Sequence, residues 1–462
     1  MAATLLRMYD LIILGGGPGG YVAAERAAHA GLSTLLLESD LVGGTCLNRG
    51  CIPTKSLLAG AKVYRHALEG EKFGIRAKIE GASLDGLIGF DFAKAMAWKD
   101  DVVGKIRSGV EFSVKKAGAE IRKARGVLAS PTSIRLDDGS LVEGRSIIVA
   151  TGSSPARPPI PGLAGNPLAI TSDEILALPA APKRLVIIGG GVIGIEFASF
   201  FSAIGVEVSV IEMLPEILPF MDKELVSIYR RSLRAVKIET GAKVEAIEGA
   251  SVRYTKGDET KVAEGDLVLV ATGRRPKVAG IGLEELGIAH SPKGIVVDDS
   301  LRTNVPGIYA IGDVTGRSLL AHSASAMGEI AVETIRGKPR AMAWKAVPWV
   351  VYGDPECAGV GMTEEEAKAE GIDYAKAVIP ARVSGRFLAE NGQGAHGAVK
   401  LLAAKADGRI LGATLVASYA GESIWGLQGM VERGATVTEL EQRIFPHPTV
   451  SELFHEAAMA LA

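Results

Sequence analysis

One pattern occurs twice in the sequence: an apolar strand, a glycine-rich turn, a helix and a second strand that closes on an acid. The first copy is YDLIILGGGPGGYVAAERAAHAGLSTLLLE, and the second is RLVIIGGGVIGIEFASFFSAIGVEVSVIE. In both copies the acid follows the first glycine of G-x-G-x-x-G by 23 residues. Because all four parts recur together, the pattern predicts two βαβ units that each bind a dinucleotide. The residues concerned are Gly15, Gly17, Gly20 and Glu38 in the first copy and Gly189, Gly191, Gly194 and Glu212 in the second.

The three glycines of such a turn have separate tasks. The first permits the tight turn, the second lets the main chain approach a pyrophosphate, and the third lets the helix pack closely on the strand. The N-terminus of the helix then faces the phosphates with free N–H groups. The alternative is a pair of plain βαβ units without a ligand, which the double occurrence disfavours.

The two halves also end alike but differ in length. SIIVATGS carries Thr151 and Gly152, and LVLVATGRRP carries Thr272 and Gly273. Thr151 follows Gly15 by 136 residues, whereas Thr272 follows Gly189 by only 83. Most of the excess must therefore lie after Glu38, where two helix-like stretches and a close cysteine pair are found.

Length and composition narrow the class of protein. A chain of 462 residues is too long for one core and predicts about three domains. A net charge of −2 offers no basic field for nucleic acid, and no apolar run is long enough to span a bilayer. The lead MAATLLRMYD is too short for a signal peptide. We expect a cytoplasmic protein, unless an organelle leader has been removed.

Cys46 and Cys51 are separated by four residues in GGTCLNRGCIP. In a regular α-helix, residues five apart have Cα atoms about 8.7 Å apart. A disulfide tolerates only about 4.4–6.8 Å, so a bonded pair requires an irregular helix start, which Gly50 and Pro53 would allow. Two buried thiols or a metal pair are the alternatives. We expect no metal, because no second Cys/His pair lies nearby to complete a site.

A third stretch, TNVPGIYAIGDVTG, places Asp313 after a short strand. Together with GGTCLNRGCIPTK and the two glycine turns, it makes the whole chain resemble the FAD-dependent pyridine nucleotide-disulfide oxidoreductases. The resemblance implies FAD on the first unit and NAD on the second, because a carboxylate at Glu212 repels the 2′-phosphate of NADP. The implied FAD residues are Gly15, Gly17, Gly20, Glu38, Lys55, Gly126, Thr151, Gly152 and Asp313. The implied NAD residues are Gly189, Gly191, Gly194, Glu212 and Gly273.

The resemblance also implies the catalytic residues. Cys46 and Cys51 match the redox-active disulfide, and Lys55 matches a lysine near the flavin that pairs with the glutamate matching Glu196. FPHPTVSELFHEAA near the C-terminus supplies His447 and the glutamate that orients it, Glu452. Thr449-x-x-Glu452 also has the form of a capping box, so one glutamate could both cap and orient. The family completes this site across a homodimer interface.

The expected fold is α/β, with two Rossmann-like domains, for FAD and NAD, and a C-terminal α+β dimerisation domain. The expected boundaries are 1–152 for the first part of the FAD-binding domain, 153–276 for the NAD-binding domain, 277–345 for the second FAD part and 346–462 for the dimerisation domain. No nucleotide motif follows residue 346. Cys357, alone in DPECAGVG, is interpreted as a small core residue.

Within the family, the dithiol stretch, Glu212 and HPTVSE favour the members that oxidise dihydrolipoamide, carried on a lipoyl domain, with NAD. Such a protein could serve a 2-oxo acid dehydrogenase complex. Thr54 and Phe445 differ from the residues usual in that branch. Phe445 is expected near the entrance for the substrate. The alternatives are another NAD(P)H-dependent disulfide reductase, similar to glutathione or mercuric reductase, and a flavoprotein scaffold without activity.

Overall fold

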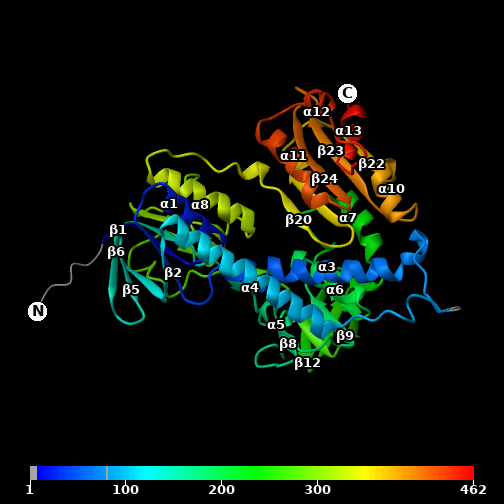
Figure 1. Cartoon of the computed structure of the whole chain (residues 1–462), viewed down its shortest axis with the longest axis horizontal. Coiled ribbons are helices and arrows are strands. Elements are labelled where there is room, and N and C mark those ends of the chain that lie inside the picture. Colours follow the sequence, from blue (N-terminus) through cyan, green and yellow to red (C-terminus); the bar gives the residue numbers. More distant parts are fainter. Residues whose placement is uncertain (1–7, 80–81) are drawn as a thin grey trace, which may run out of the picture.

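The computed structural model describes residues 8–79 and 82–462, so most of the N-terminal lead lies outside the described residues. Figure 1 shows three sheet-centred regions, at the left, at the bottom and at the upper right of the view. Helices α3 and α4 run side by side between the first two regions. No helix in the described ranges is long and apolar enough to cross a membrane.

The first sheet has seven strands in the order β3-β2-β1-β6-β5-β4, and β19 pairs with β6. Buried side chains of α1, α8 and α4 form a core with those of β1 and β2 on this sheet. The strands are β1 (Met8–Leu14), β2 (Thr34–Glu38), β3 (Glu120–Lys123), β4 (Gly126–Ser130), β5 (Ser133–Leu136), β6 (Leu141–Val149) and β19 (Ile308–Ala310). The helices are α1 (Pro18–His29), α4 (Phe92–Ala117) and α8 (Ala321–Ile335), and a short 3₁₀ turn, η3 (Gly312–Thr315), follows β19.

The second sheet repeats the plan with five parallel strands in the order β11-β10-β9-β15-β8. Its strands are β8 (Ala169–Ile170), β9 (Arg184–Ile188), β10 (Glu207–Ile211), β11 (Val236–Glu239) and β15 (Leu267–Val270). The helices are α5 (Ser172–Ile175), α6 (Val192–Ala203) and α7 (Lys223–Arg230), and the antiparallel strands β12 (Ala242–Glu248), β13 (Ser251–Lys256) and β14 (Glu259–Ala263) form a small separate sheet.

The second sheet is built from a segment inserted between two strands of the first sheet, β6 and β19. The chain leaves after β6 through β7 (Ser153–Pro155) and returns through β16 (Arg274–Pro276), and these two strands pair antiparallel. Ser154 therefore lies opposite Arg275. The late strand β19 then joins the first sheet beside β6.

The C-terminal region is an antiparallel sheet in the order β20-β21-β24-β23-β22, with a core that includes side chains of α11, α12 and α13. Its strands are β20 (Trp349–Val351), β21 (Glu356–Gly361), β22 (Tyr374–Pro380), β23 (Ala398–Ala404) and β24 (Ile410–Ala417). Its helices are α9 (Glu364–Ala369), α10 (Gly385–Asn391), α11 (Ala420–Glu432), α12 (Val437–Glu441) and α13 (Glu452–Met459). The α/β fold class expected from the sequence is confirmed, and the four residue boundaries given above stay predictions.

A buried ion cluster joins the second region to the C-terminal sheet. Lys400 on β23 has a side chain only 2% exposed, and its Nζ lies 2.8 Å from an oxygen of Asp222, which caps α7. Glu364, at the start of α9, is a second partner of Lys400. Buried charges are tolerated when they are paired in this way, and the pairs connect α7 of the second region to the C-terminal sheet.

Most of the extra residues that make the first half longer than the second form helices. These helices are α2 (Gly44–Arg49), α3 (Cys51–Leu68) and α4, which confirms the two helix-like stretches noted in the sequence. Gly50 separates α2 from α3 with φ −146° and ψ −107°, which is not a helical conformation. The cysteine pair therefore straddles a break between two helices.

Candidate active site

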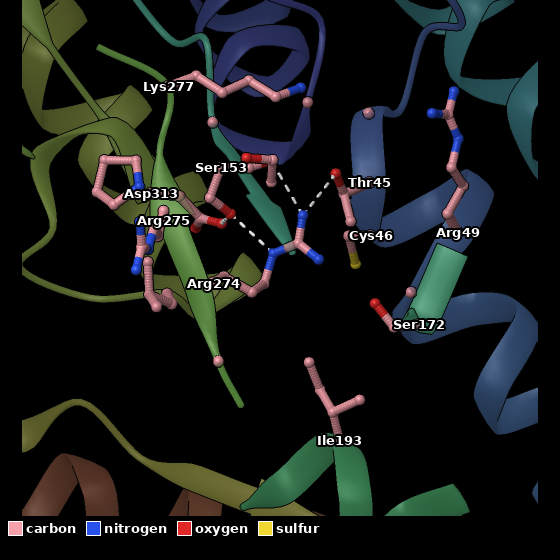
Figure 2. Close-up of a pocket in the computed structure, with 18 of the residues that line it drawn as sticks. Thr45, Cys46, Arg49, Ser153, Ser172, Ile193, Arg274, Arg275, Lys277 and Asp313 are labelled. Atoms are coloured by element: carbon pink, nitrogen blue, oxygen red, sulfur yellow. Dashed lines mark hydrogen bonds between the residues drawn. The ribbon is translucent and has the colours of Figure 1, made fainter. Parts of the chain in front are cut away.

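One cavity of about 2060 Å³ is lined by both glycine turns, the cysteine pair and the strand ends of both Rossmann-like regions. Figure 2 shows part of it, with Cys46, Ser153, Arg274 and Asp313 around the same space. The predicted site residues that line it are Gly15, Gly17, Gly20, Glu38, Cys46, Cys51, Lys55, Gly126, Thr151, Gly152, Gly189, Gly191, Glu196, Glu212, Gly273 and Asp313. Gly194, His447 and Glu452 are not among its lining residues.

The glycine turns have equivalent geometry in the two halves. Gly15 and Gly189 have φ values of +114° and +111°, and a Cβ on either would collide with a main-chain carbonyl of the neighbouring strand end. Gly17 and Gly191 are the N-caps of α1 and α6, and a Cβ at either has no neighbouring heavy atom closer than 4.0 Å. The open space at these helix N-termini fits a pyrophosphate. Gly194 instead packs against the turn itself, as the third glycine of the motif should.

Glu38 and Glu212 both brace the turn beside them. The Oε2 atom of Glu38 accepts the N–H of Gly16 at 2.7 Å, and that of Glu212 accepts the N–H of Gly190 at 2.5 Å. Each Oε1 atom accepts the main-chain N–H two residues further on, at 2.8 and 2.7 Å. A carboxylate offers about four acceptor positions, so each acid retains capacity for ribose hydroxyls.

The cysteines form a disulfide whose Cα atoms are 4.7 Å apart. That separation lies within the range a disulfide tolerates and is far shorter than a regular helix would give. The irregular geometry expected from the spacing is confirmed, with the break at Gly50. Cys51 is the first residue of α3, where the free N–H groups of a helix stabilise a thiolate. The third cysteine, Cys357, is free and buried, as interpreted from the sequence.

Lys55 and Glu196 meet across the cavity wall. Lys55 Nζ lies 2.7 and 2.9 Å from the two carboxylate oxygens of Glu196, although 141 residues separate them in the chain. Lys55 projects from α3, in the segment that only the first half carries, and Glu196 from α6 of the second half. The pair therefore connects the disulfide-bearing helix to the second Rossmann-like region.

Asp313 belongs to a hydrogen-bond network with Ser153 and Arg274, two residues to which the sequence analysis gave no role. Its Oδ2 accepts the hydroxyl of Ser153 at 2.5 Å, and Arg274 donates through Nε to the Ser153 hydroxyl at 2.8 Å. Arg274 also donates to Thr45 Oγ1, next to Cys46, at 3.4 Å (Figure 2). Burial raises the pKa of Asp313, opposed by the Ser153 hydrogen bond and the charge of Arg274. Burial lowers the pKa of Arg274.

Arg274 directly follows Gly273 in ATGRRP. A basic residue after a turn expected to line a cofactor site was the sequence signal that could have marked Arg274 as a site residue. A second set of lining residues was also missed. It is the segment 319–322, at the start of α8, which carries no motif that sequence reasoning recognised. Its contact with the cavity arises because α8 packs beside α1, which no local pattern shows.

His447 and Glu452 pair away from the cavity lining, on the C-terminal region. His447 Nδ1 lies 2.9 Å from Glu452 Oε1, and the His447 side chain is 80% exposed. The peptide bond between His447 and Pro448 is cis. Glu452 Oε2 accepts the N–H of Thr449 at 2.8 Å, and this bond, followed by that from His447, lowers the pKa of Glu452.

The capping box expected at Thr449 is only half formed. Helix α13 begins at Glu452 with Ser451 as its N-cap. The Thr449 hydroxyl donates to the carbonyl of Pro446 at 2.8 Å and does not accept from the helix. The Thr449 hydroxyl therefore does not cap the helix, while Glu452 still binds both the Thr449 N–H and His447.

Comparison with known proteins agrees with this geometry. Residues 9–328 match the family model "Pyridine nucleotide-disulphide oxidoreductase", and residues 347–458 match the dimerisation domain of the same family. A dihydrolipoyl dehydrogenase of Chlamydia pneumoniae is 38% identical over 456 residues, covering 98% of this chain and 96% of that protein. One of Thermus scotoductus is 39% identical over 466 residues, covering 99% and 98%.

Solved structures resemble the whole chain as well. The HOCl-induced flavoprotein disulfide reductase RclA from Escherichia coli superposes with a TM-score of 0.86 at 29% identity, covering 98% of this chain and 100% of that one. LpdA from Mycobacterium tuberculosis gives 0.87 at 28% identity, covering 98% and 99%. With two family models spanning most of the sequence and relatives aligned along nearly all of it, the chain belongs to the pyridine nucleotide-disulphide oxidoreductase family.

Proposed function

We propose that the protein is an NAD-dependent enzyme that oxidises dihydrolipoamide to lipoamide through the Cys46–Cys51 disulfide, with FAD and NAD as cofactors. The observation that carries the proposal is a disulfide in one cavity with two dinucleotide-type turns. Full-length relatives near 38% identity that are named dihydrolipoyl dehydrogenase support the choice of substrate.

The residues of the first half fit FAD, and those of the second half fit NAD. The open helix start at Gly17 suits the FAD pyrophosphate, Glu38 the adenosine ribose, and Asp313 a ribityl hydroxyl. Gly191 and Glu212 offer the same features to NAD. FAD, when bound, supplies an acceptor for the electron pair of the dithiol and a hydride donor for NAD.

The chemistry of the chain itself is thiol–disulfide exchange. A substrate thiolate attacks Sγ of Cys46, the bond to Cys51 breaks, and Cys51 leaves as a thiolate stabilised by the start of α3. The second substrate thiolate then attacks the substrate sulfur of the mixed disulfide, so lipoamide departs as the cyclic disulfide and Cys46 leaves as a thiolate that takes up one proton. Two substrate thiols have then been oxidised, Cys46 is a thiol, Cys51 is a thiolate, and the second substrate proton stays on the base.

A base is needed to take the proton of each substrate thiol. The chain carries the family's dimerisation domain, and the exposed His447 lies on it, outside the cavity lining of its own chain. We propose a homodimer in which the partner subunit's His447 faces Cys46. Glu452 holds Nδ1, which leaves Nε2 to accept the proton, a task that histidine performs in many enzymes.

The substrate group would be carried on a lipoyl domain, and a 2-oxo acid dehydrogenase complex is the proposed larger partner. The cytoplasmic location expected from the sequence stays a prediction. A second candidate function is NAD(P)H-dependent reduction of a different disulfide. The likeness to RclA, a flavoprotein disulfide reductase, supports the disulfide reduction but not a choice between NADH and NADPH. A scaffold without activity would not need the disulfide, the Lys55–Glu196 pair and the His447–Glu452 pair together.

One comparison tests the proposal. The FAD-loaded protein is assayed for NADH formation from dihydrolipoamide and NAD, and in parallel for NADPH oxidation with oxidised glutathione. We expect turnover in the first assay. Activity in the second assay alone would overturn the assignment, and activity in neither would favour a scaffold.

A further inference from the structure

Tyr352 is a residue of the C-terminal region that contacts both members of the Lys55–Glu196 pair. Its main-chain N–H donates to Glu196 Oε1 at 3.0 Å, and the centroid of its ring lies 4.6 Å from Lys55 Nζ. Tyr352 directly follows β20 and also lines the cavity. One residue of the dimerisation domain thus holds two residues contributed by the first and second regions.

The position of this ring is itself constrained. Val351, just before Tyr352, pairs with Cys357 of β21, which fixes the main chain. On the other side, a Cβ added at Gly421 would lie 3.6 Å from the Tyr352 ring, so the start of α11 packs against it. The N–H of Gly421 donates to Glu356 at 3.0 Å, which holds that helix start in place. Tyr352 is 36% exposed and its ring packs on one side against the start of α11, so the ring offers the lysine a surface to rest on.

The two contacts reach the Lys55 ammonium from different sides. The Glu196 carboxylate binds the ammonium from α6, and the ring face attracts it from the C-terminal sheet. A lysine side chain is flexible, so a carboxylate alone would leave the ammonium free to pivot about it. A ring on a second side restricts this movement of the ammonium.

We propose that Tyr352 is a positioning residue that fixes the ammonium of Lys55 toward the flavin site, its ring holding the lysine and its N–H holding Glu196. The geometric part stands on the contacts above, and its consequence for FAD rests on the proposed function. A correctly placed cation stabilises the negative charge of reduced flavin. Moving it away makes the bound flavin harder to reduce.

The test compares Tyr352→Leu with Tyr352→Phe in the FAD-loaded, full-length protein. The phenylalanine keeps the ring and the N–H, whereas the leucine keeps only the N–H. We expect the leucine variant to lose roughly threefold to tenfold in the equilibrium constant for flavin reduction, the range of one cation–π contact. For a two-electron couple, tenfold corresponds to about 30 mV of lowered potential. The phenylalanine variant should match the wild type.

A double-mutant cycle tests whether Tyr352 changes the flavin potential through Lys55. In a Lys55→Met background, Tyr352→Leu should change the potential no further, because the group it positions is gone. A matched control is Tyr419→Leu, which removes a ring 5.7 Å from Lys62 on the same helix α3 and should leave the potential unchanged. If the leucine variant does not retain FAD, Tyr352→Met is measured in its place.

An unchanged potential in the leucine variant would overturn the proposal, as would an equal shift in the Lys55→Met background. The potential is measured with reductant and a reference dye, so no lipoamide chemistry is involved. A wild-type protein that fails to oxidise dihydrolipoamide would refute the proposed substrate while leaving this comparison intact.

Discussion

The carboxylate of Glu212 accepts the N–H of Gly190 at 2.5 Å, so the residue expected to select the nucleotide also braces the turn that would hold its phosphates. Glu38 does the same for Gly16 in the other half. The two acids are thus matched, and each can serve as the control for the other.

Replacing Glu212 with Ala should raise the KM for NAD by about tenfold or more, because a hydrogen bond to a charged group contributes roughly 1.5–3 kcal/mol. FAD content should stay at the wild-type level. Glu38→Ala should give the reverse, with FAD content reduced and the KM for NAD little changed. Steady-state kinetics and the flavin absorbance of the purified protein measure both. A loss of FAD in Glu212→Ala alone would mean that the cofactors are assigned to the wrong halves.

Replacing Cys51 with Ser should abolish oxidation of dihydrolipoamide, since a serine cannot complete the disulfide. FAD should remain bound, because the glycine turns and Asp313 are untouched. Cys357→Ala is the matched control: the thiol is free and fully buried in a core, so activity should persist. Thiol titration of the reduced, folded proteins should show one reactive thiol fewer in Cys51→Ser, which keeps only Cys46 of the pair, than in the wild type. Loss of FAD in Cys51→Ser would make this cysteine structural.

Complementation between subunits tests whether the site is shared. His447→Gln and Cys51→Ser homodimers should each be inactive or slowed by about 10²–10⁴-fold, the usual contribution of a general base. After the two are unfolded and refolded together, hybrid dimers contain one site with an intact disulfide and an intact histidine. Activity should therefore reappear in the mixture. Failure of a verified hybrid dimer to regain activity would place both residues of each site on one chain.

Lys400→Met should lower the free energy of unfolding by about 3–5 kcal/mol, because it leaves the buried Asp222 without its cation and removes the buried partner of Glu364. Lys368→Met is the control: Lys368 is 60% exposed and pairs with the same Glu364 at 2.8 Å. An exposed pair contributes about 0–1 kcal/mol, so its loss should matter little. Urea unfolding of the two variants gives the comparison. Equal effects would mean that burial adds nothing to this cluster.

The same cluster predicts how stability depends on acid. Burial by itself raises the pKa of Glu364, but hydrogen bonds from three lysines and Tyr374 outweigh it and hold the pKa well below its ordinary value. A carboxyl with a lowered folded-state pKa stabilises the protein above its unfolded pKa, near 4.3, and this contribution is lost as pH falls further. Unfolding free energies measured from pH 7 down to 3 should fall less steeply in Lys400→Met than in the wild type.

The parts of the site that could be predicted from the sequence are those encoded locally. The glycine turns and the break between Cys46 and Cys51 each depend on residues a few positions apart, and the acids recur at one spacing of 23 residues after the first glycine. Contacts between distant segments could not be read that way. Lys55 and Glu196 were paired only through family resemblance, and neither Tyr352 nor Arg274 was assigned a role, because each reaches the site through packing between sheets. The capping box predicted at Thr449 was wrong in one half, because the Thr449 hydroxyl donates to the carbonyl of Pro446.

The paired strands β7 and β16 have a consequence for how the chain is made. All the strands of the second sheet lie between residues 169 and 270, whereas the first sheet needs β19, residues 308–310, to pair with β6. Domains tend to fold as units while the ribosome is still adding residues. The second sheet therefore leaves the ribosome complete while the first still lacks a strand. Of the two Rossmann-like regions, the one begun first is therefore finished second, and its final strand must dock beside a neighbour synthesised about 160 residues earlier.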